Sequence, residues 1–176
     1  NLFRYLTFRS GGAVITALFL SFALGRPVIR WLKSKQPHAT VREDTPERHA
    51  MTKKGTPTMG GVLILLAMLI STLLWVDLTN GYVWTVLLVT IGFGAVGFVD
   101  DYLKLTKRNS KGMSGRMKLI VQSLVAFSAA ISIMSLTRDP LATSVSVPFF
   151  KSFLVELGWL FIPFAMFVMV GASNAV

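Results

Sequence analysis

Five long apolar runs dominate this sequence and leave few folds open to it. A helix that crosses the hydrocarbon core of a bilayer needs roughly 20 mostly apolar residues. The runs occupy residues 10–31, 58–76, 78–99, 119–137 and 157–176. We therefore predict an all-α fold, a polytopic transmembrane helical bundle with five spans.

Other fold classes fit this sequence poorly. Hydrophobic residues make up 53% of the chain and charged residues 15%, whereas soluble proteins carry roughly 25% charged residues. The strands of a membrane β-barrel would alternate apolar and polar residues over about ten positions. The absence of cysteine excludes disulfides and Cys-based zinc sites. Two histidines, His38 and His49, are too few for a His-rich metal site and are interpreted as solvated loop residues.

The basic residues predict an orientation in the membrane. The net charge is +10, and most of the 18 lysines and arginines fall in two blocks, at residues 26–54 and 104–118. The positive-inside rule then places the connections 32–57 and 101–118 in the cytoplasm. Nucleic-acid binding would need basic residues on one exposed face with aromatic residues between them. Charge blocks between apolar runs do not provide such a face, so we expect no nucleic-acid partner.

Two connections are expected on the outer side. The short one, around Asp77–Gly81, is a tight hairpin that makes the second and third spans antiparallel neighbours. The longer one contains the segment 144–150, an alternating, β-prone stretch that is ended by Pro148. We predict a short β-hairpin there.

The segment Lys53–Gly61, at the start of the second span, has residues that suit anion binding. Pro57 suits a first helical turn, and a helix N-terminus offers unpaired N–H groups and the positive end of the helix dipole. Lys53 adds a positive charge and Thr58 a hydroxyl. The same residues would also suit a plain membrane-entry cap with close helix packing, and the pattern alone does not decide between the two.

Asp100 and Asp101 end an otherwise uncharged span. Acids near a membrane are costly and usually functional, and a helix C-terminus disfavours negative charge. A neighbouring cation, from the protein or a metal, would relieve both problems. Because adjacent helical residues point about 100° apart, we expect one carboxylate to face the site and the other a different partner. The alternative is that both are solvated and paired with Lys104 or Arg108.

The basic loop 107–118 is the third candidate segment. Lys111, Arg116 and Lys118 could hold phosphate or anionic lipid headgroups, although ordinary positive-inside charge explains them as well. Asn174 lies late in the fifth span, where an asparagine serves as an interhelical contact more often than as a ligand.

Together these segments resemble the phospho-N-acetylmuramoyl-pentapeptide transferase family, within the polyprenyl-phosphate N-acetylhexosamine-1-phosphate transferase superfamily. The resemblance covers the whole chain in span order. Residues 41–61 look like the family's signature, Gly97–Tyr102 like its paired-aspartate motif, Lys111–Gly112 and Arg116–Lys118 like its basic loop, and Gly171–Val176 like the start of its next motif. Thr45 and Arg48 depart from the family's usual Gly and Ser, and we expect little consequence.

This resemblance implies a reaction and a set of site residues. Phospho-N-acetylmuramoyl-pentapeptide would pass from its UDP conjugate to undecaprenyl phosphate, with Mg²⁺ as cofactor and UMP as by-product. This is the first membrane step of peptidoglycan synthesis, on which cell shape and division depend. Asp100 and Asp101 would serve catalysis and the metal. The substrates would contact Lys53, Thr58, Lys111, Arg116, Lys118 and Asn174.

The resemblance also implies a setting and leaves alternatives. We expect a multi-pass protein of the bacterial inner membrane with its active face in the cytoplasm; a homodimer is left open. Residues 1–176 are expected to be the N-terminal part of one longer transferase domain, and to be inactive alone. The alternatives are a related polyprenyl-phosphate N-acetylhexosamine-1-phosphate transferase, a lipid-linked transporter or flippase, and a non-catalytic scaffold. Transport would place polar residues near the membrane midplane, whereas here they gather at one face.

Overall fold

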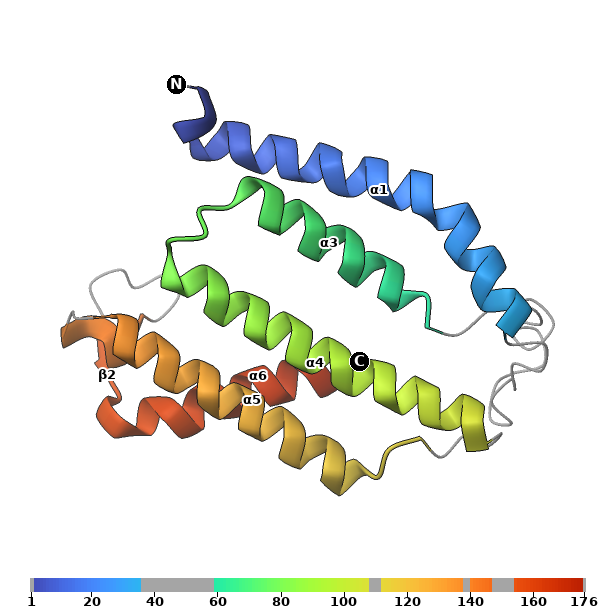
Figure 1. Cartoon of the computed structure of the whole chain (residues 1–176). Coiled ribbons are helices and arrows are strands. Elements are labelled where there is room, and N and C mark those ends of the chain that lie inside the picture. Colours follow the sequence, from blue (N-terminus) through green and yellow to red (C-terminus); the bar gives the residue numbers. More distant parts are fainter. Residues whose placement is uncertain (1, 36–58, 108–111, 138–139, 147–153, 176) are drawn as a thin grey trace. The chain divides into compact units, whose positions relative to one another are not determined.

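A computed structural model describes residues 2–35, 59–107, 112–137, 140–146 and 154–175 (Figure 1). The predicted helical fold is confirmed. The helices are α1 (Leu6–Lys35), α3 (Gly61–Trp75), α4 (Gly81–Lys107), α5 (Gly115–Leu136) and α6 (Phe161–Asn174). Short 3-10 turns lie at Leu2–Arg4 (η1), Pro140–Thr143 (η2) and Gly158–Leu160 (η3), and the two strands are β1 (Ser144–Ser146) and β2 (Leu154–Glu156).

Three of the described helices are long and apolar enough to cross a membrane: Leu6–Ser34 in α1, all of α4 and all of α5. The other two, Gly61–Trp75 and Gly158–Asn174, are shorter apolar helices. The second span therefore begins as a helix at Gly61, later than the expected Thr58. Met59 is the reason, because its φ of 69° is left-handed and a right-handed helix cannot continue through that conformation.

Helix α4 runs past the predicted end of the third span at residue 99 and ends at Lys107. The extension is polar. Asp100 and Lys104 lie one turn apart in it and form an ion pair, a spacing that supports helix. The carboxylates therefore lie within a helix that continues from Asp101 to Lys107, more than one further turn.

The chain divides into two compact units, the first made of Asn1–Asp77 with Gly94–Ser114 and the second of Leu78–Phe93 with Gly115–Val176. In the first unit, α1 packs along α3. The side chain of Leu65 on α3 covers Gly94 on α4, where an added Cβ would lie 2.7 Å from a Leu65 methyl. This close approach brings the C-terminal half of α4 next to α3.

Trp75 fastens the far end of α3 to α1. Its ring lies over Gly12, where an added Cβ would come within 2.5 Å of ring carbon. The indole N–H donates to Thr16 Oγ1 at 2.9 Å, and Arg9 Nε donates to the Trp75 carbonyl oxygen at 2.6 Å. Phe8 packs edge-on against the same ring. The end of α3 opposite Met59 is thus fixed by ring packing and two hydrogen bonds.

In the second unit, α5 packs against α6. Ala126, Ala129 and Ala130 on α5 are fully buried, and such small residues let membrane helices approach closely. The predicted hairpin is confirmed: β1 pairs with β2 in antiparallel register, with Val145 opposite Val155. One residue, Leu157, separates its second strand from η3.

Candidate active site

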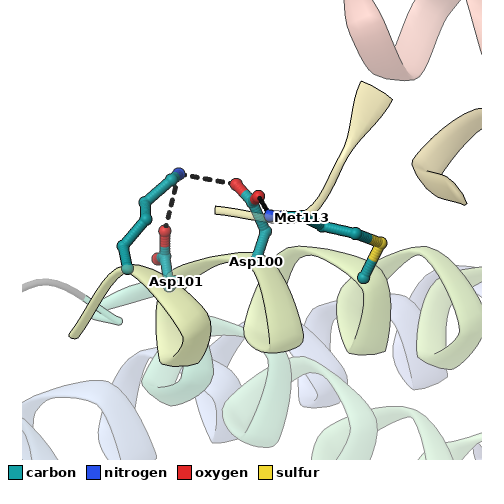
Figure 2. Close-up of polar contacts among 4 residues, drawn as sticks. Asp100, Asp101 and Met113 are labelled. Atoms are coloured by element: carbon teal, nitrogen blue, oxygen red, sulfur yellow. Dashed lines mark hydrogen bonds and ion pairs between the residues drawn. The ribbon is translucent and has the colours of Figure 1, made fainter. Parts of the chain in front are cut away.

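The paired aspartates lie near the end of α4, and Lys104 forms hydrogen bonds with both (Figure 2). Lys104 Nζ donates to Asp100 Oδ2 at 2.5 Å and lies 3.4 Å from Asp101 Oδ1. The Asp100 side chain is 18% exposed and that of Asp101 38%. The expected cation beside the acids is therefore supplied by the protein, one turn further along the same helix. The expectation of separate partners is wrong for Lys104, because that lysine lies against both carboxylates.

The backbone before α5 also contacts Asp100. The amide of Met113 donates to Asp100 Oδ1 at 2.7 Å, as Figure 2 shows. Asp100 therefore accepts hydrogen bonds at both of its oxygens, one from its own helix and one from a segment that follows it. A carboxylate held in this way has a defined position, because charge-assisted hydrogen bonds are stronger than neutral ones.

A cavity of about 410 Å³ connects the aspartates with the start of α3. Met59, Gly61 and Val62 line it from that end, and Asp100 and Asp101 line it from α4. The rest of the lining comes from Ile64, Leu65, Gly94, Gly97 and Phe98. Two segments that were candidates on sequence grounds thus meet at one cavity. Its wall is apolar except at the carboxylates.

Three predicted substrate-binding residues, Lys53, Thr58 and Lys111, lie outside the described residues. Arg116 and Lys118 lie in the first turn of α5, where Arg116 is exposed and Lys118 is half-buried. Both belong to the second unit, whereas the aspartates belong to the first.

Asn174 ends α6 and contacts α5. Its side-chain N–H₂ group donates to Gln122 Oε1 at 2.7 Å and to the carbonyl oxygen of Val170 at 2.8 Å. Gln122 also donates to Ser173 Oγ at 3.1 Å and is only 2% exposed. Asn174 is therefore part of an interhelical polar contact, the alternative that the sequence left open.

The sequence analysis did not predict two contributors to these contacts, Gln122 and Met113. Gln122 is a polar residue inside an apolar span, a signal that was available. Met113 contacts Asp100 through its backbone amide, which no side-chain pattern reveals. Pairing with Lys104 is the alternative that the sequence left open for the two acids, and the structure shows that pairing.

The aspartates offer carboxylate oxygens, the kind of ligand that Mg²⁺ prefers. Within the described ranges no group of three or more His, Cys, Asp or Glu side chains gathers around one point. A Mg²⁺ ion bound by one or two carboxylates completes its shell with water and substrate phosphates. The chemistry of the two carboxylates fits that kind of site.

Comparison with known protein families shows to which family this chain belongs. The model of glycosyl transferase family 4 matches residues 83–176, which is more than half of the sequence and includes both aspartates. The chain belongs to glycosyl transferase family 4. A second model, the phospho-N-acetylmuramoyl-pentapeptide-transferase signature 1, matches residues 53–65. The family 4 match and the signature thus cover both walls of the cavity.

Individual relatives of this family 4 chain agree with that signature. A phospho-N-acetylmuramoyl-pentapeptide-transferase of Granulibacter bethesdensis is 63% identical over 177 residues, which cover 100% of this chain and 49% of the relative. One from Maricaulis maris is 50% identical over 182 residues, covering 100% and 50%. The resemblance inferred from the sequence is confirmed. The chain spans about half the length of these curated relatives.

Proposed function

We propose that the full-length protein transfers phospho-N-acetylmuramoyl-pentapeptide from its UDP conjugate to undecaprenyl phosphate. A phosphate oxygen of the lipid attacks the β-phosphorus of the nucleotide sugar and forms a new P–O bond. The bond from that phosphorus to the bridging oxygen breaks, and UMP leaves with the electron pair. The observation that carries this proposal is the cavity lined by both the signature segment, through Met59–Val62, and the Asp100–Asp101 pair.

Charge is the main obstacle to this reaction, because both reactants are anions. Fixed positive groups aimed at developing negative charge are the usual solution. A lipid monophosphate is largely dianionic near neutral pH, since its second pKa is about 6. It therefore needs little help from a general base. Asp100, bound to Lys104 Nζ at 2.5 Å, is better suited to holding position and charge than to taking a proton.

We assign Mg²⁺ as the cofactor, held by Asp100 and Asp101 together with residues elsewhere in the full-length protein. When bound, it would offset the negative charge of the phosphates. Lys104 lies 2.5 Å and 3.4 Å from oxygens of the two carboxylates. It keeps two like charges on adjacent residues compatible with one another.

The remaining roles are assigned by charge. Lys53 and Thr58 bind the nucleotide end of the donor, and Lys111, Arg116 and Lys118 bind phosphate or headgroup oxygens. The side-chain nitrogen of Asn174 donates to Gln122 and Val170, so a substrate contact would use its carbonyl oxygen. Residues 1–176 alone are expected to be inactive, because the chain spans about half of its relatives.

The protein is proposed to act at the inner membrane of a bacterium, with residues 32–57 and 101–118 on the cytoplasmic side. The basic blocks at these connections support that orientation. The helices that can span a bilayer support a multi-pass membrane protein.

The test is release of UMP by membranes that carry the full-length gene. UDP-N-acetylmuramoyl-pentapeptide should give UMP only when undecaprenyl phosphate is present. UDP-N-acetylglucosamine is the matched donor, and a preference for it would assign the protein to the related N-acetylhexosamine-1-phosphate transferases. Movement of labelled lipid across vesicles without UMP release would instead support a flippase.

A further inference from the structure

Gly112 lies against the side chains of Asp100 and Lys104. An added Cβ at position 112 would overlap Asp100 Oδ1 and would lie 2.8 Å from Lys104 Cε and 2.9 Å from Asp100 Cγ. Contacts that close force something to move. Its φ is not in the left-handed region, so a side chain at position 112 would be opposed by its contacts with Asp100 and Lys104 and not by backbone conformation.

The next residue explains the close approach. Met113 can donate its amide to Asp100 Oδ1 at 2.7 Å only if the backbone at Gly112 lies directly against that carboxylate. A side chain at position 112 would displace either this segment or the Asp100 carboxylate, and either shift would lengthen the hydrogen bond. The absence of a side chain and the presence of the hydrogen bond are therefore two parts of one arrangement.

We propose that Gly112 and the amide of Met113 form a backbone clamp that fixes the Asp100 carboxylate, which makes Gly112 a positioning residue for the transferase reaction. The inference rests on the proposed function. Lys104 holds one oxygen of Asp100 and the clamp holds the other. Positioning is expected to dominate this chemistry, and a misplacement of about 1 Å can cost about 10²-fold in rate.

The chain provides a matched control. Gly115 lies three residues further on, and an added Cβ there meets nothing within 4 Å. Gly115→Ala makes the same chemical change in the same segment, so it reports any general effect of removing a glycine. We expect Gly112→Ala to lower kcat about 10- to 10²-fold with KM for the nucleotide sugar changed less than about twofold. Gly115→Ala should retain wild-type kcat.

A double-variant cycle shows whether Gly112 acts through Asp100. If it does, adding Gly112→Ala to Asp100→Asn should lower kcat by less than about twofold beyond Asp100→Asn alone, because effects of residues that act together are not additive. An undiminished loss on adding Gly112→Ala to the Asp100→Asn variant would overturn the inference.

Hydrogen exchange gives a readout that needs no turnover. In the full-length protein in detergent, the Met113 amide should be protected, and Asp100→Ala or Gly112→Ala should raise its exchange rate at least about 10-fold, since both remove the hydrogen bond that protects it. Exchange within α5 should stay unchanged. Equal Met113 exchange in wild type and Asp100→Ala would overturn the clamp, and this comparison decides the matter even if Gly112→Ala does not fold.

The two hypotheses fail differently. Absence of UMP release by the wild-type protein would remove the proposed function and leave the exchange result standing. Wild-type kcat in Gly112→Ala, alongside a strong loss in Asp100→Asn, would remove the clamp and leave the function.

Discussion

The side-chain amide of Asn174 donates to Gln122 at 2.7 Å, so that the last residue of α6 is hydrogen-bonded to a fully buried side chain of α5. Ser173 Oγ accepts from the nitrogen of the same Gln122 amide. Polar groups that are buried in a membrane protein must find partners within it. Gln122 thus hydrogen-bonds to two side chains at the end of α6, those of Ser173 and Asn174.

Replacing that glutamine should destabilise the protein. Gln122→Leu keeps a similar volume but takes one partner away from both Asn174 and Ser173, at a cost of about 1–3 kcal/mol. The melting temperature of the full-length protein in detergent should fall. Ser128→Ala, which removes only a hydrogen bond within α5, is the control and should change it much less.

The aspartates should be needed for turnover. Asp100→Asn and Asp101→Asn should each lower kcat at least about 10²-fold, the scale of losing one positioned charge. UMP release by correctly inserted protein measures this. Near-wild-type turnover of both variants would leave the acids as structural partners of Lys104.

Lys53 should affect binding more than chemistry. Lys53→Ala should raise KM for the nucleotide sugar while kcat changes little, because a contact that is equal in ground and transition states acts uniformly. Steady-state kinetics at saturating lipid measure the two constants. A large fall in kcat with unchanged KM would instead show that Lys53 stabilises the transition state more than the bound substrate.

The contact between α1 and α3 at Gly12 should not tolerate a larger side chain. Gly12→Val places a side chain where the Trp75 ring lies, and such overpacking costs about 1–3 kcal/mol. Thermal unfolding of the purified protein measures the loss. Gly11→Val is the control, since a Cβ at Gly11 meets nothing within 4 Å, and an equal loss in both variants would contradict the proposed packing role.

The orientation can be checked directly, because the chain has no cysteine. Single cysteines introduced at Lys35 and at Asn80 should react with a membrane-impermeant thiol reagent from opposite sides. Intact cells should label the Asn80 variant, and inverted vesicles the Lys35 variant. Labelling of both from outside would falsify the topology.

The sequence predicted the helices and the hairpin because hydrophobic runs and alternation are local signals. The short connection between the second and third spans also predicted antiparallel neighbours whose ends could meet, and Met59 and Gly61 do share a cavity with the aspartates. The start of the helix at Gly61 could not be predicted, because the left-handed φ of Met59 has no sequence signature.

The details of the site were less predictable, for a physical reason. The Lys104 pairing could be read from its one-turn spacing. The Met113 contact could not, because any residue except proline carries the same amide. The burial of Gln122 depends on which face of α5 meets α6, and α5 carries small buried alanines and apolar residues on all sides.

Met59 has a consequence for how the chain tolerates substitution. A left-handed residue other than glycine costs about 1–2 kcal/mol, and glycine at position 59 would remove that cost. It would also remove a side chain from the wall of the cavity. At position 59, a substitution that lowers the conformational free energy of the backbone therefore also changes the shape of the cavity.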